Sequence, residues 1–177
     1  MSRIGKQNIM VPPKTSVAMN DGKVTVKGPL GEISRQLSER ILVVSENDHV
    51  TLAPREQDTE SLKLWGTYAS EIVSMIEGVN KEFQKKLIVE GIGFKSEVKG
   101  SDLVMSLGFS HQVTLKIPQG LKVTAEKNII TVSGIDKELV GQFVAKVRAQ
   151  KLPEPYKGKG IRGFDEVIRR KQGKKAA

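Results

Sequence analysis

The apolar positions between residues 17 and 52 alternate with polar ones or form short runs separated by turn residues, and this pattern is typical of antiparallel strands. The triplet Asn-Asp-Gly at 20–22 is a strong hairpin signal and predicts a tight turn between two of these strands. The expected strands lie around Val17 and at 24–26, 33–37, 41–44 and 50–52.

From Asp58 to Gly78 the apolar spacing changes to three and four residues, which predicts an amphipathic helix that packs on the sheet. Asp58, Thr59 or Ser61 is available as the N-cap, and Gly78 is the expected end of the helix. The apolar stripe consists of Leu62, Trp65, Ala69, Ile72, Val73 and Ile76.

The second half of the chain repeats this order of elements. A helix is expected to begin at Asp136 and must end before Pro153, because a proline disfavours helical backbone in the residue that precedes it. A turn falls at 99–102. The strands expected before this helix lie at 83–89, 94–98, 103–107, 113–117, 121–125 and 129–132.

A comparison of the chain with itself at an offset of 80 residues supports an internal duplication. The helices align at an offset of 75, with Gly66 on Gly141, so the difference falls in the loop before the helix, where insertions are tolerated. The offset of 80 pairs Val24, Gly28, Val43, Glu46 and Thr51 with Val104, Gly108, Val123, Glu126 and Thr131. Chance similarity between β-rich segments is the alternative, but a helix at the same place in both halves favours duplication.

These patterns predict an α+β protein with two duplicated domains, each an antiparallel β-sheet with one packed helix. The expected divisions are an N-terminal arm at 1–7, a first domain at 8–81, a second domain at 82–152 and a basic C-terminal extension at 153–177. A length of 177 residues is sufficient for two small cores.

The positive charge of the chain is concentrated at its C-terminal end. The chain carries a net charge of +9. Residues 148–177 hold ten basic and three acidic side chains, a net charge of +7, so the remainder contributes only +2. A solvated chain end is one interpretation of such a segment. Its basic residues alternate with Gly, Pro and Tyr, however, and this mixture favours contact with a polyanion, nucleic acid being the first candidate.

The sequence offers little support for catalysis. The chain has no cysteine and two histidines, His49 and His111, without metal-ligand spacing. Residues 158–163 match the glycine pattern of dinucleotide-binding loops, but Pro153 and Pro155 precede them in place of a buried strand. We predict no enzyme, no cofactor and no metal site. The sequence also contains no signal peptide or membrane-spanning run, so a cytoplasmic protein is expected.

Three segments resemble a known family: MSRIGK at 1–6, LGFSH at 107–111 and PEPYKGKGI at 153–161. With these segments the chain resembles, from end to end, the family of bacterial large-subunit ribosomal protein number six. The resemblance implies two duplicated α+β domains and a role without catalysis. It also implies binding to 23S rRNA near the stalk base and the factor-binding region, beside neighbouring large-subunit proteins, to stabilise the rRNA fold during translation. The C-terminal domain and tail would carry most of the contact, without a membrane or a homo-oligomer.

The predicted rRNA contacts centre on the segment 153–161. Lys157, Lys159 and Arg162 are expected to contact phosphates. Gly158 and Gly160 are expected to let the backbone approach the RNA closely.

Further expected contacts lie on both sides of these residues. Tyr156 is expected to stack on a base or ribose, although packing against Pro155 is an open alternative. Arg148 and Lys151 would extend the basic patch along the end of the second helix. The tail would follow RNA grooves in an extended or partly helical form through Arg169, Arg170, Lys171, Lys174 and Lys175.

Overall fold

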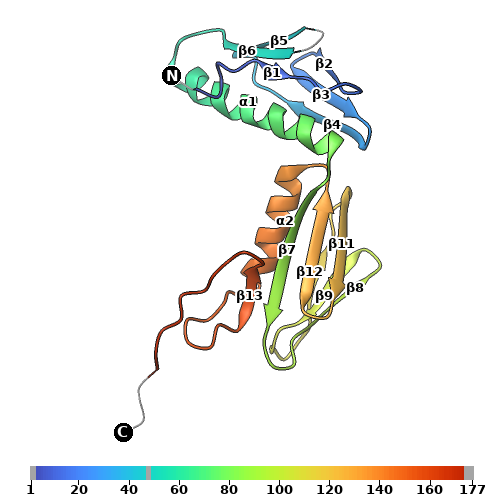
Figure 1. Cartoon of the computed structure of the whole chain (residues 1–177), viewed down its shortest axis with the longest axis vertical. Helices are drawn as coiled ribbons and strands as arrows, with labels where there is room; N and C mark the ends of the chain where they lie inside the picture. The colour runs from blue at the N-terminus through green and yellow to red at the C-terminus, as the bar shows by residue number, and fades with distance from the viewer. Residues whose placement is uncertain (1–2, 47–48, 174–177) are drawn as a thin grey trace. The chain divides into compact units, whose positions relative to one another are not determined.

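The computed structural model of the chain describes residues 3–46 and 49–173 and forms two compact units (Figure 1). The first unit extends to Glu82 and includes Ile135–Lys137, and the second holds Phe83–Gly134 and the chain from Glu138 onward. Each unit combines antiparallel strands with one helix, so the predicted α+β class is confirmed.

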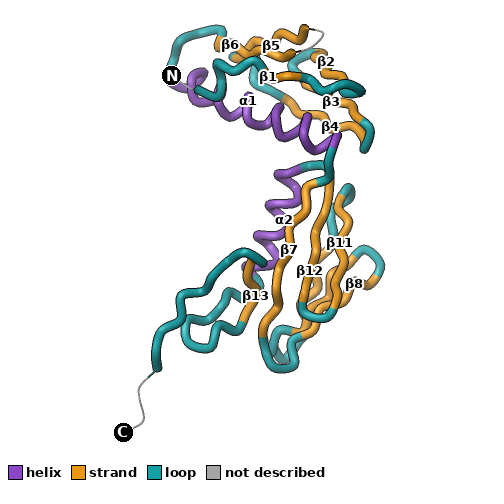
Figure 2. The backbone as a smooth tube through the Cα atoms, in the orientation of Figure 1, coloured by secondary structure: helices purple, strands orange, loops and turns teal. Residues whose placement is uncertain are grey.

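The first unit contains two three-stranded antiparallel sheets and one long helix (Figure 2). The sheets have the strand orders β1-β6-β5 and β2-β3-β4. The elements are β1 (Ile9–Met10), β2 (Ser16–Asn20), β3 (Lys23–Gly28), β4 (Gly31–Gln36), β5 (Ile41–Glu46), β6 (His49–Pro54) and α1 (Thr59–Asn80). The predicted hairpin joins β2 to β3, with φ of 48° at Asp21 and 73° at Gly22, and two consecutive positive φ angles are characteristic of a type I′ turn.

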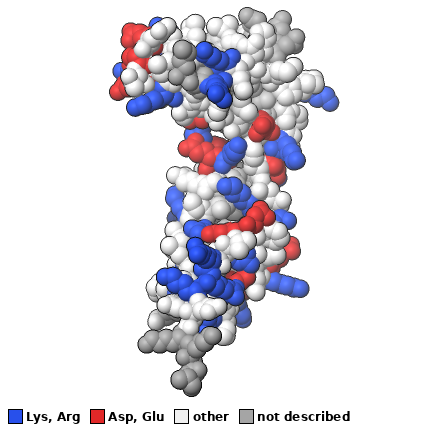
Figure 3. All heavy atoms as spheres, turned by 60° about the vertical axis from the view of Figure 1, so that its left-hand side comes forward, with Lys and Arg blue, Asp and Glu red and all other residues white. Residues whose placement is uncertain are grey.

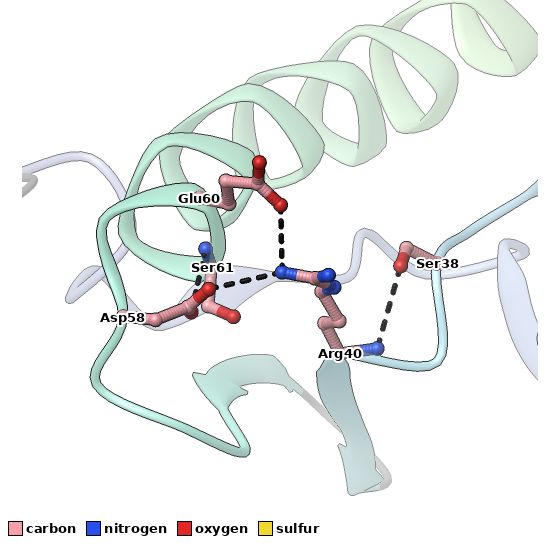
Figure 4. Close-up of polar contacts among 5 residues, drawn as sticks. All are labelled: Ser38, Arg40, Asp58, Glu60 and Ser61. Atoms are coloured by element: carbon pink, nitrogen blue, oxygen red, sulfur yellow. Dashed lines mark hydrogen bonds and ion pairs between the residues drawn. The ribbon is translucent and has the colours of Figure 1, made fainter.

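The start of α1 is fixed by a small polar cluster (Figure 4). Asp58 is the N-cap, and its Oδ1 accepts a hydrogen bond of 3.0 Å from the backbone N–H of Ser61. Arg40 Nη1 lies 2.9 Å from Asp58 Oδ2 and 2.7 Å from Glu60 Oε2. Hydrogen bonding from Ser61, assisted by the charge of Arg40, lowers the pKa of Asp58.

The end of α1 differs from the prediction, because the helix passes Gly78 and ends at Asn80. The Asn80 Nδ2 donates a 2.8 Å hydrogen bond to the Ile76 carbonyl, and the Lys81 N–H donates one of 2.8 Å to the Glu77 carbonyl. These two bonds satisfy carbonyls of the last turn, so the chain does not need a glycine to end the helix.

The core of the first unit forms where α1 packs on the strands. Ala69 and Ile72 are completely buried, and the Trp65 Nε1 donates a 2.9 Å hydrogen bond to the Leu52 carbonyl. Gly5 packs against the indole so closely that a Cβ there would lie 2.6 Å from the Trp65 ring. Part of the predicted N-terminal arm therefore contributes to the packing of this unit.

The second unit has the same arrangement with one strand added. Its sheets have the orders β10-β9-β8 and β11-β12-β7-β13. The elements are β7 (Phe83–Glu90), β8 (Lys95–Lys99), β9 (Asp102–Ser106), β10 (Val113–Lys116), β11 (Leu121–Glu126), β12 (Ile129–Gly134), α2 (Lys137–Ala149) and β13 (Gly160–Gly163). Fully buried side chains from both sheets and α2 form its core, among them Leu103, Met105, Ile130, Val132 and Val147.

Apart from β13, the two units correspond element by element, as the duplication predicts. An offset of 80 residues places β5 and β6 on β11 and β12 with the same bounds. The order β11-β12-β7 corresponds to β5-β6-β1, and β10-β9-β8 to β4-β3-β2. Strand β13 has no counterpart in the described part of the first unit, so the feature that distinguishes the second unit lies within the predicted C-terminal extension.

Candidate nucleic-acid interface

Strand β13 holds the basic C-terminal segment on the sheet of the second unit. It pairs antiparallel with β7, with Ile161 opposite Val89, and the Ile161 side chain is completely buried. Residues 150–159, which we call the basic loop, therefore connect α2 to a strand of the sheet. The predictions for the tail did not include this strand.

The basic loop is closed by backbone hydrogen bonds. The Glu154 N–H donates to the Lys159 carbonyl at 2.9 Å, and the Gly158 N–H donates to the Glu154 carbonyl at 3.1 Å. The Ile161 N–H donates to the Lys151 carbonyl at 2.8 Å, which ties the start of the loop to β13. Such bonds between residues near in sequence hold the loop in one conformation.

The two glycines at the end of this segment are needed by the packing of the chain itself. Gly158 and Gly160 have φ of 73° and 143°, a region that side-chain-bearing residues rarely adopt, and both are buried. A Cβ on Gly160 would lie 2.6 Å from the Leu152 carbonyl oxygen, and one on Gly158 would lie 2.9 Å from the Arg170 Nε. At Gly160 the missing Cβ thus leaves room for the backbone at Leu152, and the expected close approach of RNA stays a prediction.

Arg148 is engaged by a carboxylate of its own unit. Its Nη2 and Nε lie 2.6 and 3.1 Å from the two oxygens of Glu166, and the Gly163 N–H donates to Glu166 Oε2 at 2.9 Å. The hydrogen bond from Arg148 is the largest cause of a lowered pKa at Glu166, and it raises the pKa of Arg148. This bidentate pair joins the end of α2 to the segment after β13, so Arg148 has a structural role.

Arg162 is held in a similar way. Its Nη2 lies 2.8 Å from Glu90 Oε1, and its Nη1 donates a 3.1 Å hydrogen bond to the Glu166 carbonyl. The hydrogen bond from Arg162 lowers the pKa of Glu90. Arg170 adds a longer contact of 3.9 Å from its Nη2 to Glu90 Oε2. Neutralising Arg162 would therefore remove contacts within the protein itself, in addition to any contact with RNA.

Three lysines of the basic loop differ from these arginines in their ion pairing. Within residues 3–46 and 49–173, no ion pair joins Lys151, Lys157 or Lys159 to a carboxylate. Lys157 is exposed and Lys159 is half-buried. Figure 3 shows basic side chains gathered in the lower part of the view, some of them beside carboxylates. The lysines of the basic loop are thus available to an external anion, whereas the arginines of β13 and α2 are already paired.

The tail returns to the basic loop after β13. The Lys171 N–H donates a 2.8 Å hydrogen bond to the Pro155 carbonyl, while the side chains of Arg169 and Lys171 are exposed. Residues 166–173 form neither a helix nor a strand, so this described part of the tail is not helical. The predicted contacts Lys174 and Lys175 lie outside the described residues.

Two aromatic side chains beside the basic loop, Phe109 and His111, were not among the predicted contacts. The Phe109 ring stacks on His111 with centroids 5.9 Å apart, and the Lys151 Nζ lies 4.5 Å from the Phe109 centroid. Tyr156, which was predicted, has 59% of its surface exposed. The sequence shows a phenylalanine between Gly108 and Ser110, but its exposure and its contact with Lys151 depend on the fold.

Other chemistry finds no support in the described part of the chain. Among residues 3–46 and 49–173 no three His, Cys, Asp or Glu side chains are grouped in a way that would hold a metal ion. No helix within the same ranges is long and apolar enough to cross a membrane. Basic side chains beside exposed aromatic rings are typical of protein surfaces that bind anions with planar groups, and nucleic acids are ligands of this kind.

Comparison with known proteins identifies the family. The model of the ribosomal protein L6 family matches residues 11–82 and 90–163, one match in each half of the chain, and the chain belongs to this family. The family is one of ribosomal structural proteins and not of enzymes, which confirms the predicted resemblance and the prediction of no catalytic role.

Named relatives cover almost the whole chain. Large ribosomal subunit protein uL6 of Nostoc sp. is 46% identical over 175 residues, which are 98% of this chain and 96% of the relative. The uL6 protein of Magnetococcus marinus is 46% identical over 176 residues, 99% of each chain. The uL6c protein of Guillardia theta is 43% identical over 175 residues, 98% of each chain.

Proposed function

We propose that this chain is a structural constituent of the large ribosomal subunit that binds 23S rRNA through the basic loop and stabilises the rRNA fold during translation. The observation that carries the proposal is the set of Lys151, Lys157 and Lys159, which have no carboxylate partner within the described residues. A cation without an internal partner gains more from a phosphate than a cation that must first leave a carboxylate.

The charge distribution supports an RNA contact in the same part of the chain. Residues 148–177 contribute +7 of the net charge of +9, and all three lysines belong to this part. The rigid backbone of the basic loop adds to this, because a loop that is already ordered loses little conformational entropy on binding. The exposed side chains of Arg169 and Lys171 extend the cationic surface.

The place within the subunit is proposed from family membership. It is the rRNA near the stalk base and the factor-binding region, beside neighbouring large-subunit proteins and within the ribosome of the cytoplasm. We expect no membrane partner and no homo-oligomer. The names of the relatives, large ribosomal subunit proteins, support assembly into that subunit.

Changing Lys157 and Lys159 to Gln tests the assignment of the basic loop. We expect weaker binding to 23S rRNA and a smaller dependence of log Kd on log salt, since each lost phosphate contact lowers this slope by about 0.7–0.9. The measurement is filter binding to 23S rRNA over a series of KCl concentrations.

A matched variant carries the same change of charge away from the basic loop. Lys116→Gln with Lys127→Gln removes two exposed lysines of β10 and of the β11–β12 turn in the same unit. We expect this variant to keep the slope of the wild type. Equal slopes for the two double variants would contradict the proposed contact.

A further inference from the structure

A hollow of about 480 Å³ lies between the basic loop and the sheet of the second unit. Phe94, just before β8, and Leu107 and Gly108, just after β9, line it on one side, and residues of the basic loop line it on the other. Its volume falls within the range of about 300–1,000 Å³ that is typical of sites for single small molecules. We propose that this hollow receives the base of one unpaired nucleotide of the RNA, an inference that rests on the proposed function.

The walls of the hollow suit a planar apolar group. Tyr156 and Leu152, which belong to the basic loop, have 59% and 58% of their surface exposed, and Phe94 is half-buried. Large apolar side chains that stay open to solvent together mark a surface that another molecule covers. Bases of unpaired RNA stack on aromatic rings in this way, because every base has a π-face.

The rim of the hollow carries the charge that a nucleotide requires. Lys151, Lys157 and Lys159 line it together with a single carboxylate, that of Glu154, so the rim has a net charge of +2. A free phosphate would use the lysines without the rings, and an uncharged aromatic ligand would use the rings without the lysines. A nucleotide within an RNA strand uses both, since its base is flanked by phosphates.

One of these lysines is held in position before any ligand arrives. The Lys151 Nζ lies 4.5 Å from the centroid of the Phe109 ring, which in turn stacks on His111 with an interplanar angle of 14°. A cation over an aromatic face is attracted by the ring quadrupole. Phe109 is thus a positioning residue, which keeps the charge of Lys151 at the edge of the hollow.

Changing Tyr156 to Leu tests the hollow separately from the lysines. The variant keeps an apolar side chain but loses the ring, so affinity for 23S rRNA should fall about 5- to 150-fold, the range that corresponds to one lost base–aromatic stack. The dependence of log Kd on log salt should stay the same, because no phosphate contact is removed. Tyr156→Phe keeps the ring and should bind as the wild type does.

Phe164→Leu is the matched control for the loss of a ring. Phe164 is 52% exposed, belongs to the same unit and has the Lys86 Nζ 6.0 Å from its ring centroid, but it does not line the hollow. This variant should bind 23S rRNA like the wild type. The thermal unfolding midpoint should be the same for all of these proteins, because both rings are exposed.

Base-specific chemical probing of the bound 23S rRNA locates the nucleotide. One unpaired base should be protected by the wild type, Tyr156→Phe and Phe164→Leu, and exposed again with Tyr156→Leu. If Tyr156→Leu binds and protects like the wild type while the Lys157 and Lys159 double variant loses affinity, the hollow proposal is overturned and the proposed function stands. If neither variant changes binding, both are overturned.

Discussion

At the scale of residues, the neighbours of each positive side chain decide what it does. Arg162 and Lys159 are three positions apart, yet Arg162 is bound to Glu90 while Lys159 has no carboxylate partner among the described residues. The sequence predicted both as phosphate contacts, because charge and spacing can be recognised without a structure. The pairing of Arg162 with Glu90 spans 72 positions, and only the antiparallel pairing of β13 with β7 brings them together.

Changing Glu166 to Gln should destabilise the second unit at neutral pH. The variant loses the charge that Arg148 binds, and the side chains of the pair are 37% and 33% exposed, so the expected loss is about 1–2 kcal/mol in the free energy of unfolding. Urea unfolding followed by circular dichroism measures it. Trp65 fluorescence gives a separate record of the first unit, which should be unaffected.

The effect of Glu166→Gln should depend on pH in one direction. The folded protein lowers the pKa of Glu166 below its usual value of 4.5, so the stabilisation is complete above that pH and is lost as the pH falls through the lowered pKa. Wild type and variant should therefore converge in acid. Glu126→Gln, at an exposed position of β11, is the control and should match the wild type at every pH. A difference that persists in strong acid would contradict the role of the carboxylate charge.

At the scale of elements, local signals predicted the structure well and distant pairing was missed. The β2–β3 hairpin was predicted because Asn-Asp-Gly favours positive φ, and the helices because their apolar stripes repeat every three or four residues. Strand β13 has the sequence Gly-Ile-Arg-Gly, in which a single apolar residue gives no alternation. Its position depends on the free edge of β7 and on Ile161 filling the core, neither of which the segment itself reveals.

Changing Gly160 to Ala should loosen the junction between the basic loop and β13. At φ 143° the strained backbone alone costs about 1–3 kcal/mol, and the new Cβ would meet the Leu152 carbonyl oxygen at 2.6 Å. Urea unfolding and amide exchange at β13 should both report the loss. Gly93→Ala is the matched control, because Gly93 has φ 74° but no atom within 4 Å of a Cβ. Equal destabilisation of the two variants would contradict the close packing at Gly160.

At the scale of the whole molecule, most of the net positive charge lies in one of the two duplicated units. Both units share the order of strands and a covering helix, but the second adds β13 and the basic loop. The body of the chain before residue 148 carries a net charge of only +2, while the last thirty residues carry +7. Each unit thus has its own core, and the addition to the second unit carries the surface that we propose for RNA binding.

Sucrose-gradient sedimentation of cell lysates tests whether the lysines of the basic loop hold the chain on the large ribosomal subunit. The wild-type chain and the Lys116 and Lys127 double variant should migrate with the large ribosomal subunit and remain there at moderately raised salt. The Lys157 and Lys159 double variant should be released from the subunit at that salt concentration, because it has lost phosphate contacts. Wild-type protein that sediments apart from the large subunit, or a double variant at Lys157 and Lys159 that resists salt as the wild type does, would contradict the account.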